Sequence, residues 1–83
     1  MKYLLVTYVL KADGKIDEQV GVSKNLKKND IQTCNVIMDF KNKKVEKCVI
    51  DAQKVDSTWD QLYQYYQSLY PAIIERLEKE SIT

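Results

Sequence analysis

Residues 59–77 carry their apolar side chains at the spacing of one helical face, and this feature constrains the fold more than any other. On a helical wheel of about 100° per residue, the leucines, isoleucines and tyrosines of this stretch, Tyr65 excepted, fall within an arc of about 140°. A helix with one apolar face is stable only when another element covers that face. The stretch therefore predicts a helix that packs one face on a sheet.

Pro71 lies inside this stretch, on the polar side of the wheel. Proline removes one backbone hydrogen bond and disfavours helical geometry at the preceding residue, Tyr70. The apolar stripe nevertheless keeps its phase beyond the proline, so we expect one helix over residues 58–80 that bends at Pro71. Ser57 is the expected N-cap, because its hydroxyl can accept a hydrogen bond from a backbone N–H of the first turn.

The first half of the chain has the composition and alternation of β-strands, which are predicted at residues 3–11, 16–23, 33–40 and 45–50. The sequence therefore predicts one α+β domain over residues 1–83. In it, a four-stranded antiparallel sheet (β-β-β-β-α) packs on one long C-terminal helix. The expected core contacts join Trp59, Tyr66, Leu69 and Ile73 to Val6, Tyr8, Val36 and Met38.

Ala12-Asp13-Gly14 is a turn signal between the first two strands. A three-residue loop with Gly14 in the left-handed conformation collects the apolar side chains on one face, whereas a two-residue turn would mix them with polar ones. The second hairpin turns at residues 41–44 without a glycine, so its register stays open. The preferred register of the first hairpin pairs Leu10 with Ile16, Val6 with Val20 and Leu4 with Val22.

This chain lacks the residue patterns that typically carry enzyme chemistry. It has no histidine, so it has neither a Ser–His nor a Cys–His nucleophile pair. Cys34 and Cys48 lack the further ligands of a zinc site, and Gly14 and Gly21 cannot form a phosphate-binding loop. We therefore expect a non-enzymatic protein without metal or cofactor, in which both cysteines are free and buried as small apolar residues.

The apolar run at residues 3–10 is not typical of a targeting segment. It ends at Lys11, contains Thr7 and Tyr8, and lacks a small-residue cleavage site. It is also far too short to cross a bilayer. The expected location is the cytoplasm, with reduced thiols and no membrane contact.

The first strand is apolar on both of its faces. Tyr3, Leu5 and Val9 lie on the face that the C-terminal helix cannot cover, and Ile37 joins them from the third strand. Antiparallel strands with a wet face normally alternate cleanly, so something else should cover this patch. We expect a second copy of the chain, which would make the protein a homodimer. The alternative is that the connector at residues 23–31 covers the patch.

The net charge of +1 hides a basic middle segment, residues 24–47. Its lysines could contact phosphate groups if the connector and the 41–44 turn share one end of the sheet. Because the segment contains no arginine and no recognition motif, nucleic-acid binding is the alternative function rather than the leading one. The lysines concerned are Lys24, Lys27, Lys28, Lys41, Lys43, Lys44 and Lys47.

Two stretches resemble a known group of proteins: VIMDFKNKKVEKCVI at residues 36–50 and TWDQLYQYYQSLYP at residues 58–71. They are similar to small uncharacterised accessory proteins of tailed bacteriophages, including those of cyanobacteria. The resemblance implies an accessory protein that acts by contact on a host or phage protein, and it carries over no catalytic residue. The leading functional hypothesis is thus a self-associating protein-interaction module.

Overall fold

The computed structural model of the protein describes residues 2–82. Between these residues the chain forms an α+β fold with an antiparallel sheet and helices at its C-terminal end, as the sequence predicts. The prediction is wrong in that the sheet has five strands, a short helix precedes β3, and the C-terminal helix is divided in two. In chain order the elements are β1 (Tyr3–Leu10), β2 (Ile16–Ser23), α1 (Lys28–Thr33), β3 (Val36–Asp39), β4 (Lys44–Ile50), β5 (Gln53–Lys54), α2 (Trp59–Leu69) and α3 (Pro71–Ile82).

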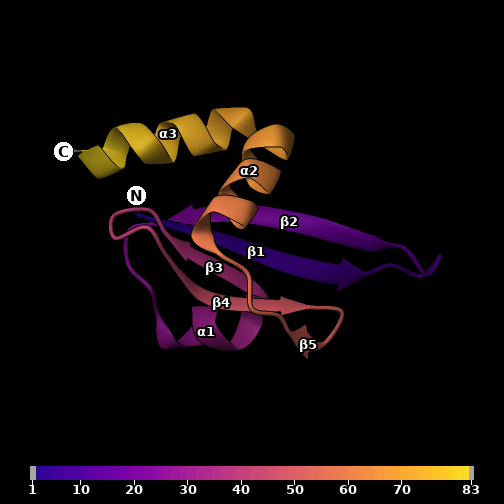
Figure 1. Ribbon diagram of the computed structural model, residues 1–83. Coiled ribbons are helices and arrows are strands. Elements are labelled where there is room, and N and C mark those ends of the chain that lie inside the picture. Colours follow the sequence, from indigo (N-terminus) through magenta and orange to yellow (C-terminus); the bar gives the residue numbers. More distant parts are fainter. Residues whose placement is uncertain (1, 83) are drawn as a thin grey trace.

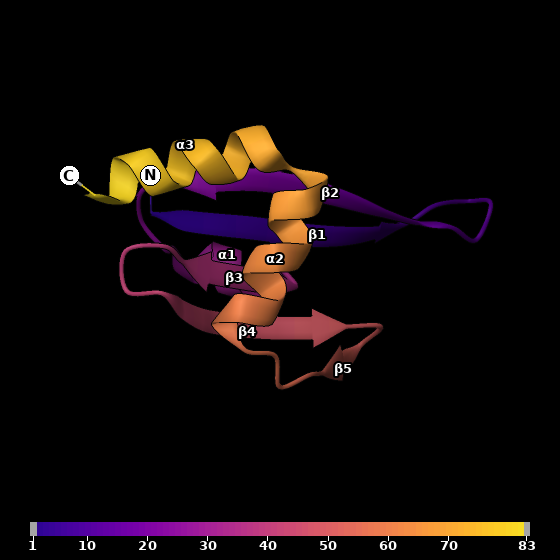
Figure 2. The same cartoon turned by 45° about the horizontal axis from the view of Figure 1, so that its top comes forward.

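The five strands follow the order β2-β1-β3-β4-β5, and each pairs antiparallel with its neighbours. β3 lies at the centre and is buried along its whole length. α2 and α3 cover one face of the sheet: α2 crosses the strands, and α3 runs above β2 (Figure 1, Figure 2). α1 lies on the opposite side of the sheet (Figure 1).

The predicted loop and register of the first hairpin are confirmed. Lys11 donates its N–H to the carbonyl of Lys15 at 2.8 Å, and Gly14 donates to the carbonyl of Lys11 at 3.0 Å. Gly14 has a φ of +84°, a conformation that favours glycine because any side chain would be strained there. The register pairs Leu10 with Ile16, Val6 with Val20 and Leu4 with Val22.

The β1–β2 hairpin extends beyond the rest of the sheet. β1 pairs with β3 only from Tyr3 to Val6, and Asn35 ends this pairing. The side-chain Oδ1 of Asn35 accepts a hydrogen bond from the N–H of Tyr8 at 3.1 Å, in place of a further residue of β3. Beyond this point β1 and β2 pair only with each other, and residues 8–18 project as a two-stranded arm (Figure 1).

The turn between β3 and β4 is organised by Asp39, whose side chain is buried. One carboxylate oxygen, Oδ1, accepts the N–H of Lys41 at 3.0 Å and that of Asn42 at 3.2 Å. The other, Oδ2, accepts the side-chain amide of Asn42 at 2.8 Å. Lys43 then takes a φ of 54°, so a lysine rather than a glycine occupies the left-handed position of this turn.

The third strand begins at Val36 instead of residue 33, because the residues before it form α1. Asp30 fixes the start of this helix: its Oδ2 accepts the N–H of Lys27 at 3.0 Å. The same residue fixes the end, since its carbonyl accepts the N–H of Cys34 at 2.8 Å. A single aspartate therefore makes local hydrogen bonds that compete with the extended conformation expected from residue 33 onward.

The C-terminal helix is interrupted at Tyr70, so the prediction of one bent helix is wrong. α2 ends at Leu69, Tyr70 has φ −132° and ψ 61°, and α3 starts at Pro71. The proline ring clashes with a helical conformation of the residue before it, which explains the break at Tyr70. The fixed φ of proline also suits the first position of a new helix.

The start of α2 differs from the prediction by one residue, because Thr58 and not Ser57 is the N-cap. The hydroxyl of Thr58 accepts the N–H of Gln61 at 3.3 Å, and the side chain of Gln61 accepts the N–H of Thr58 at 3.1 Å. Glu or Gln three residues after the cap is the usual partner in this reciprocal pair, although Asp30 takes that role in α1. Gln61 stands at that spacing from Thr58, whereas Asp60 stands there from Ser57.

The core lies between the sheet and the two C-terminal helices. As predicted, Tyr66 is buried there. Both cysteines are buried free thiols, Cys48 in this core and Cys34 outside it, near Thr7. Leu69 is 49% exposed, which contradicts the predicted core position. It is the last residue of α2 and lies at the edge of the apolar arc. The edge of the core is formed by Tyr8, Trp59 and Ile73 among other partly buried residues. Its buried members are Leu4, Val6, Val36, Met38, Phe40, Cys48, Leu62, Tyr66, Ile74 and Leu77.

Candidate functional site

A groove lies between α2 and the arm and has a volume of about 380 Å³. We call it the tyrosine groove, because three tyrosines form much of its wall. Aromatic side chains with a few polar groups among them are typical of binding sites. The lining residues are Tyr8, Ile16, Glu18, Ile50, Asp51, Gln61, Leu62, Tyr65 and Tyr66.

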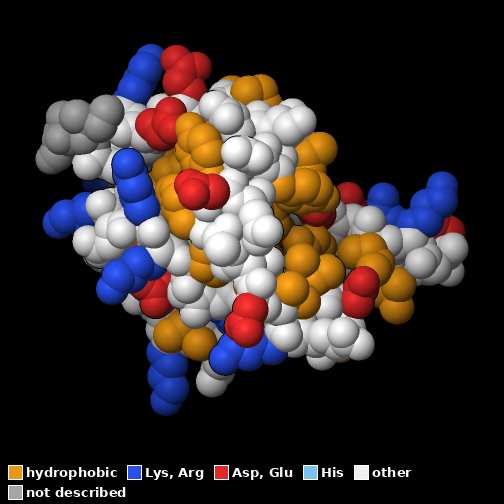
Figure 3. All heavy atoms as spheres, viewed as in Figure 1, with side chains coloured by type: hydrophobic (Ala, Val, Ile, Leu, Met, Phe, Trp, Pro, Cys, Tyr) orange, Lys and Arg blue, Asp and Glu red, His pale blue; other side chains and the backbone are white. Residues whose placement is uncertain are grey.

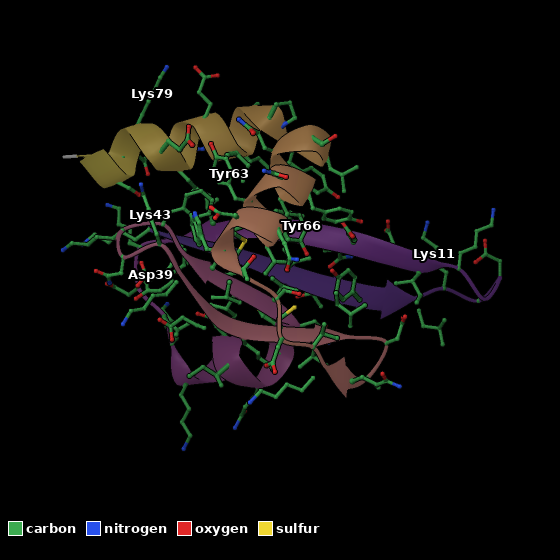
Figure 4. The ribbon with its side chains drawn as sticks, viewed as in Figure 1. Lys11, Asp39, Lys43, Tyr63, Tyr66 and Lys79 are labelled. Atoms are coloured by element: carbon green, nitrogen blue, oxygen red, sulfur yellow. The ribbon has the colours of Figure 1, made fainter. Side chains whose placement is uncertain are left out.

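The two walls of this groove come from elements that are distant in sequence. Tyr8 and Glu18 are cross-strand partners on the arm, so their side chains stand on the same face of the hairpin. Leu62, Tyr65 and Tyr66 are three and four residues apart on α2 and therefore share one side of that helix. Figure 4 shows Tyr66 between α2 and the sheet, where the two walls meet.

Tyrosine hydroxyls connect the two walls. The hydroxyls of Tyr8 and Tyr66 are hydrogen-bonded at 2.8 Å. Tyr65 donates to Glu18 Oε1, and Tyr70 donates to Glu18 Oε2, each at 3.2 Å. The carboxylate of Glu18 is thus fixed between the last turn of α2 and the residue at which the helix breaks.

Negative charge dominates the electrostatics around Glu18. Burial, followed by the negative charge of Glu18, raises the pKa of the hydroxyls of Tyr65 and Tyr70. Burial is also the main reason that the pKa of Tyr66 is raised. These hydroxyls therefore stay protonated near neutral pH. In the described part of the chain, the ion pairs of Lys and Arg involve acids other than Glu18, and Asp51 adds a second negative charge to the groove.

Four large apolar side chains next to the tyrosine groove remain in contact with solvent. Leu10 is 73% exposed, Ile16 55%, Tyr65 50% and Leu69 49%. We call these residues the apolar rim. Figure 3 shows apolar side chains gathered where α2 approaches the arm. Single exposed apolar residues are common, but a group around one groove is typical of a contact surface.

The residues predicted for self-association lie on the other face of the sheet, and they are not equally accessible. Ile37 is fully buried, next to Leu26 and Ile31 of the segment that contains α1. The connector therefore covers this position, and Ile37 cannot contact a partner. Tyr3 and Leu5 are half-buried, while Val9 on the arm is 37% exposed.

The connector and the β3–β4 turn do share one end of the sheet, as the nucleic-acid hypothesis requires. Lys2 donates its N–H to the carbonyl of Ser23 at 3.0 Å, and Phe40 donates to the carbonyl of Lys2 at 2.7 Å. These bonds place the start of the connector beside the turn, and Figure 3 shows basic side chains at that end. Lys47 differs from the other six lysines, because its Nζ donates to the carbonyl of Ile31 at 2.6 Å.

A second groove, of about 460 Å³, separates the β3–β4 turn from α2 and α3. Trp59 and Tyr63 stack there with ring centres 6.1 Å apart, and Phe40 meets Trp59 edge-on at 4.8 Å. Lys41 and Lys43 line the same groove, and Lys43 extends from the turn towards α3 (Figure 4). The structure therefore brings aromatic rings next to two of the predicted lysines.

The tyrosine groove was not predicted from the sequence, although the sequence contains one indication of it. Tyr65 is the aromatic residue that lies off the apolar stripe of residues 59–77. A large side chain outside the buried face of a helix is either solvated or part of a contact surface. The pairing of Tyr8 with Glu18 follows from the predicted hairpin register, but the position of α2 above the arm does not.

Residues 2–82 do not bring together three His, Cys, Asp or Glu side chains that could hold a metal ion. Likewise, none of the helices formed by these residues is both long enough and apolar enough to cross a membrane. Comparison of the chain with protein-family models, curated proteins and solved structures finds no match.

Proposed function

We propose that the protein is a non-enzymatic protein-interaction module, and that the tyrosine groove with its apolar rim is its contact surface. The observation that carries the proposal is the group of four exposed apolar side chains around one aromatic groove. Tyrosine gives a large contact area for little loss of conformational entropy, and its hydroxyl can satisfy polar groups of a partner. This surface is more exposed than the patch predicted on the other face.

Two kinds of partner fit an interaction module, and they would use different faces of the sheet. One is a second copy of the chain, for which Tyr3, Leu5 and Val9 remain a candidate surface without Ile37. Leu5 faces Gly21 across the hairpin, and the space beside this glycine is open, so a partner could approach there. The other is a different protein, and the resemblance to phage accessory proteins would make it a phage or host protein.

Site-specific photo-cross-linking tests both surfaces, because Ile16 and Val9 lie on opposite faces of the same arm. A benzophenone amino acid at position 16 should give an adduct with a partner protein in lysate of the natural host, since it stands at the groove. The same residue at position 29, on the exposed surface of α1, is the matched control. Mass spectrometry identifies each adduct.

The adducts also identify the partner. The benzophenone amino acid is also placed at position 9. If this variant, as purified protein, gives a species of twice the chain mass, the chain associates with itself through the other face of the sheet. The proposal is contradicted if position 16 gives no adduct beyond those of position 29.

Nucleic-acid binding is a second candidate function, favoured by Lys41 and Lys43 beside Trp59 and Tyr63. Lysines near stacked aromatic rings are the combination that binds single strands. The groove also contains Asp60 and Glu78, however, and Glu78 accepts the hydroxyl of Tyr63. These carboxylates would repel phosphate groups, which makes this function the weaker candidate.

A fluorescent single-stranded oligonucleotide tests the second candidate by anisotropy. If it binds at this end, the affinity should fall steeply with salt, because each phosphate contact releases a counterion. Replacing Lys41 and Lys43 together by Gln should weaken binding. It should also reduce the slope of log affinity against log salt concentration by the amount expected for about two phosphate contacts. Lys11→Gln on the arm is the control, and an equal effect of this change would indicate unspecific charge attraction.

A further inference from the structure

We infer that the tyrosine groove receives a segment of a partner protein that carries a cationic side chain, arginine or lysine, between apolar ones. The inference rests on the proposed function, because it names the chemistry of the partner at that surface. It follows from three properties of the groove: its charge, the arrangement of its rings, and the geometry of Glu18.

The charge of the lining is the first of these properties. Glu18 stands on the arm wall and Asp51 follows β4 on the other side, and the lining contains no lysine or arginine. Glu18 is only partly exposed, so its charge is screened less by water than that of a fully solvated carboxylate. A cationic group would compensate both charges, whereas an acidic segment or a nucleic acid would be repelled.

The arrangement of the aromatic rings is the second property. Tyr65 and Tyr66 meet edge-on with ring centres 5.1 Å apart, and Tyr66 and Tyr70 stack at 6.5 Å. Half of the surface of Tyr65 is exposed, so a cation can approach its ring. A guanidinium or ammonium group over a tyrosine face is attracted by the ring quadrupole. An arginine can combine this contact with a paired hydrogen bond to a carboxylate.

The geometry of Glu18 is the third property. Each of its oxygens accepts one tyrosine hydroxyl, Oε1 from Tyr65 and Oε2 from Tyr70. A carboxylate oxygen has two lone-pair directions, so one direction on each oxygen remains for a donor from the groove. The two tyrosines hold the carboxylate in place before a partner arrives, which reduces the entropy lost on binding.

The apolar rim explains why the cation should have apolar neighbours. Leu10 and Ile16 stand on the arm side of the groove, and Leu69 stands at the end of α2. Apolar side chains before and after the cation would cover these residues and remove them from water. Lys11 of the arm pairs with Asp17 at 3.9 Å, so it is not the expected occupant.

Three capped tripeptides test the inference: acetyl-Leu-Arg-Leu-amide, acetyl-Leu-Gln-Leu-amide and acetyl-Leu-Glu-Leu-amide. Each is titrated into the isotope-labelled full chain, and NMR shift changes report where it binds. We expect the arginine peptide to shift Ile16, Glu18 and Tyr65, and to bind about tenfold tighter than the glutamine peptide, because charge-assisted hydrogen bonds are stronger than neutral ones. The glutamate peptide should bind most weakly.

Two variants show whether Glu18 selects the cation. Glu18→Gln should reduce the affinity for the arginine peptide to that of the glutamine peptide, and it should leave the glutamine peptide unaffected. Asp17→Asn removes the adjacent carboxylate on the opposite face of the arm, so it should change neither affinity by more than about twofold.

Equal affinities for the three peptides, or shifts outside the groove, would overturn the inference. The same holds if Glu18→Gln and Asp17→Asn have the same effect. The proposed function is judged separately, because the cross-linking adducts at position 16 do not depend on the charge of the partner. Adducts at position 16 without charge selection among the peptides would leave the interaction module in place and reject its preference for a cation.

Discussion

Truncating Leu77 to alanine is expected to lower the free energy of unfolding by about 2–5 kcal/mol, the usual range for removing a buried leucine side chain. Leu77 lies on α3, is fully buried and belongs to the core between the helices and the sheet. The alanine would leave a cavity, and the surrounding side chains can move to fill it only in part. Urea unfolding followed by tryptophan fluorescence measures the change.

Leu69→Ala is the matched control for this prediction, because it removes the same atoms from the same C-terminal region. Leu69 is 49% exposed, so its truncation should change the free energy of unfolding by no more than about 0.5 kcal/mol. A loss as large as that of Leu77→Ala would mean that Leu69 is buried. Leu69 would then belong to the core and not to the apolar rim, contrary to the described fold.

Replacing Asp39 by alanine is expected to have the second-largest effect, a loss of about 2–3 kcal/mol. The change leaves the backbone N–H groups of Lys41 and Asn42 without their acceptor at the turn. It also removes the partner of the Asn42 side chain. Because these donors lie at the surface, water replaces part of the lost bonding, which limits the cost. Thermal and urea unfolding both report it.

Asp39→Asn separates the hydrogen bonds from side-chain packing. Asparagine fills nearly the same volume and keeps one acceptor oxygen for the turn, so the expected loss is only about 1 kcal/mol. If alanine and asparagine cost the same, the charge of the carboxylate and not its bonding geometry stabilises the turn.

The sequence predicts those parts of the fold that depend on one local pattern. The register of the first hairpin followed from two facts, that Gly14 tolerates a positive φ and that one register collects the apolar residues on one face. The burial of Tyr66 followed from the helical stripe. In both cases a single periodicity decides the result, and no competing local interaction changes it.

The errors arise where two local preferences compete. At Tyr70 the phase of the apolar stripe favours a continuous helix, but the steric effect of Pro71 on the preceding residue prevails. Ahead of β3, the alternation of residues 33–40 favours a strand, but the hydrogen bonds of Asp30 form a helical turn first. Relative magnitudes of such preferences cannot be obtained from periodicity alone.

The candidate site was harder to predict because it depends on tertiary placement. Tyr8 and Glu18 were predictable neighbours once the hairpin register was known. Their contacts with Tyr65, Tyr66 and Tyr70 depend on the direction in which α2 crosses the sheet. No pattern in one segment specifies this direction. The burial of Ile37 depended in the same way on where α1 lies.

The place where Asn35 ends the pairing of β1 with β3 has a mechanical consequence for the groove. Up to that point β1 has a hydrogen-bonded neighbour on each side, whereas in the arm it has β2 alone. Segments with fewer partners open at a lower free energy than the core. The groove therefore has one stiff wall, α2 on the sheet, and one compliant wall, the arm. Because the hydrogen bonds of Tyr8 and Glu18 tie the arm to α2 and Tyr70, a wider groove requires these bonds to break but no rearrangement of the core.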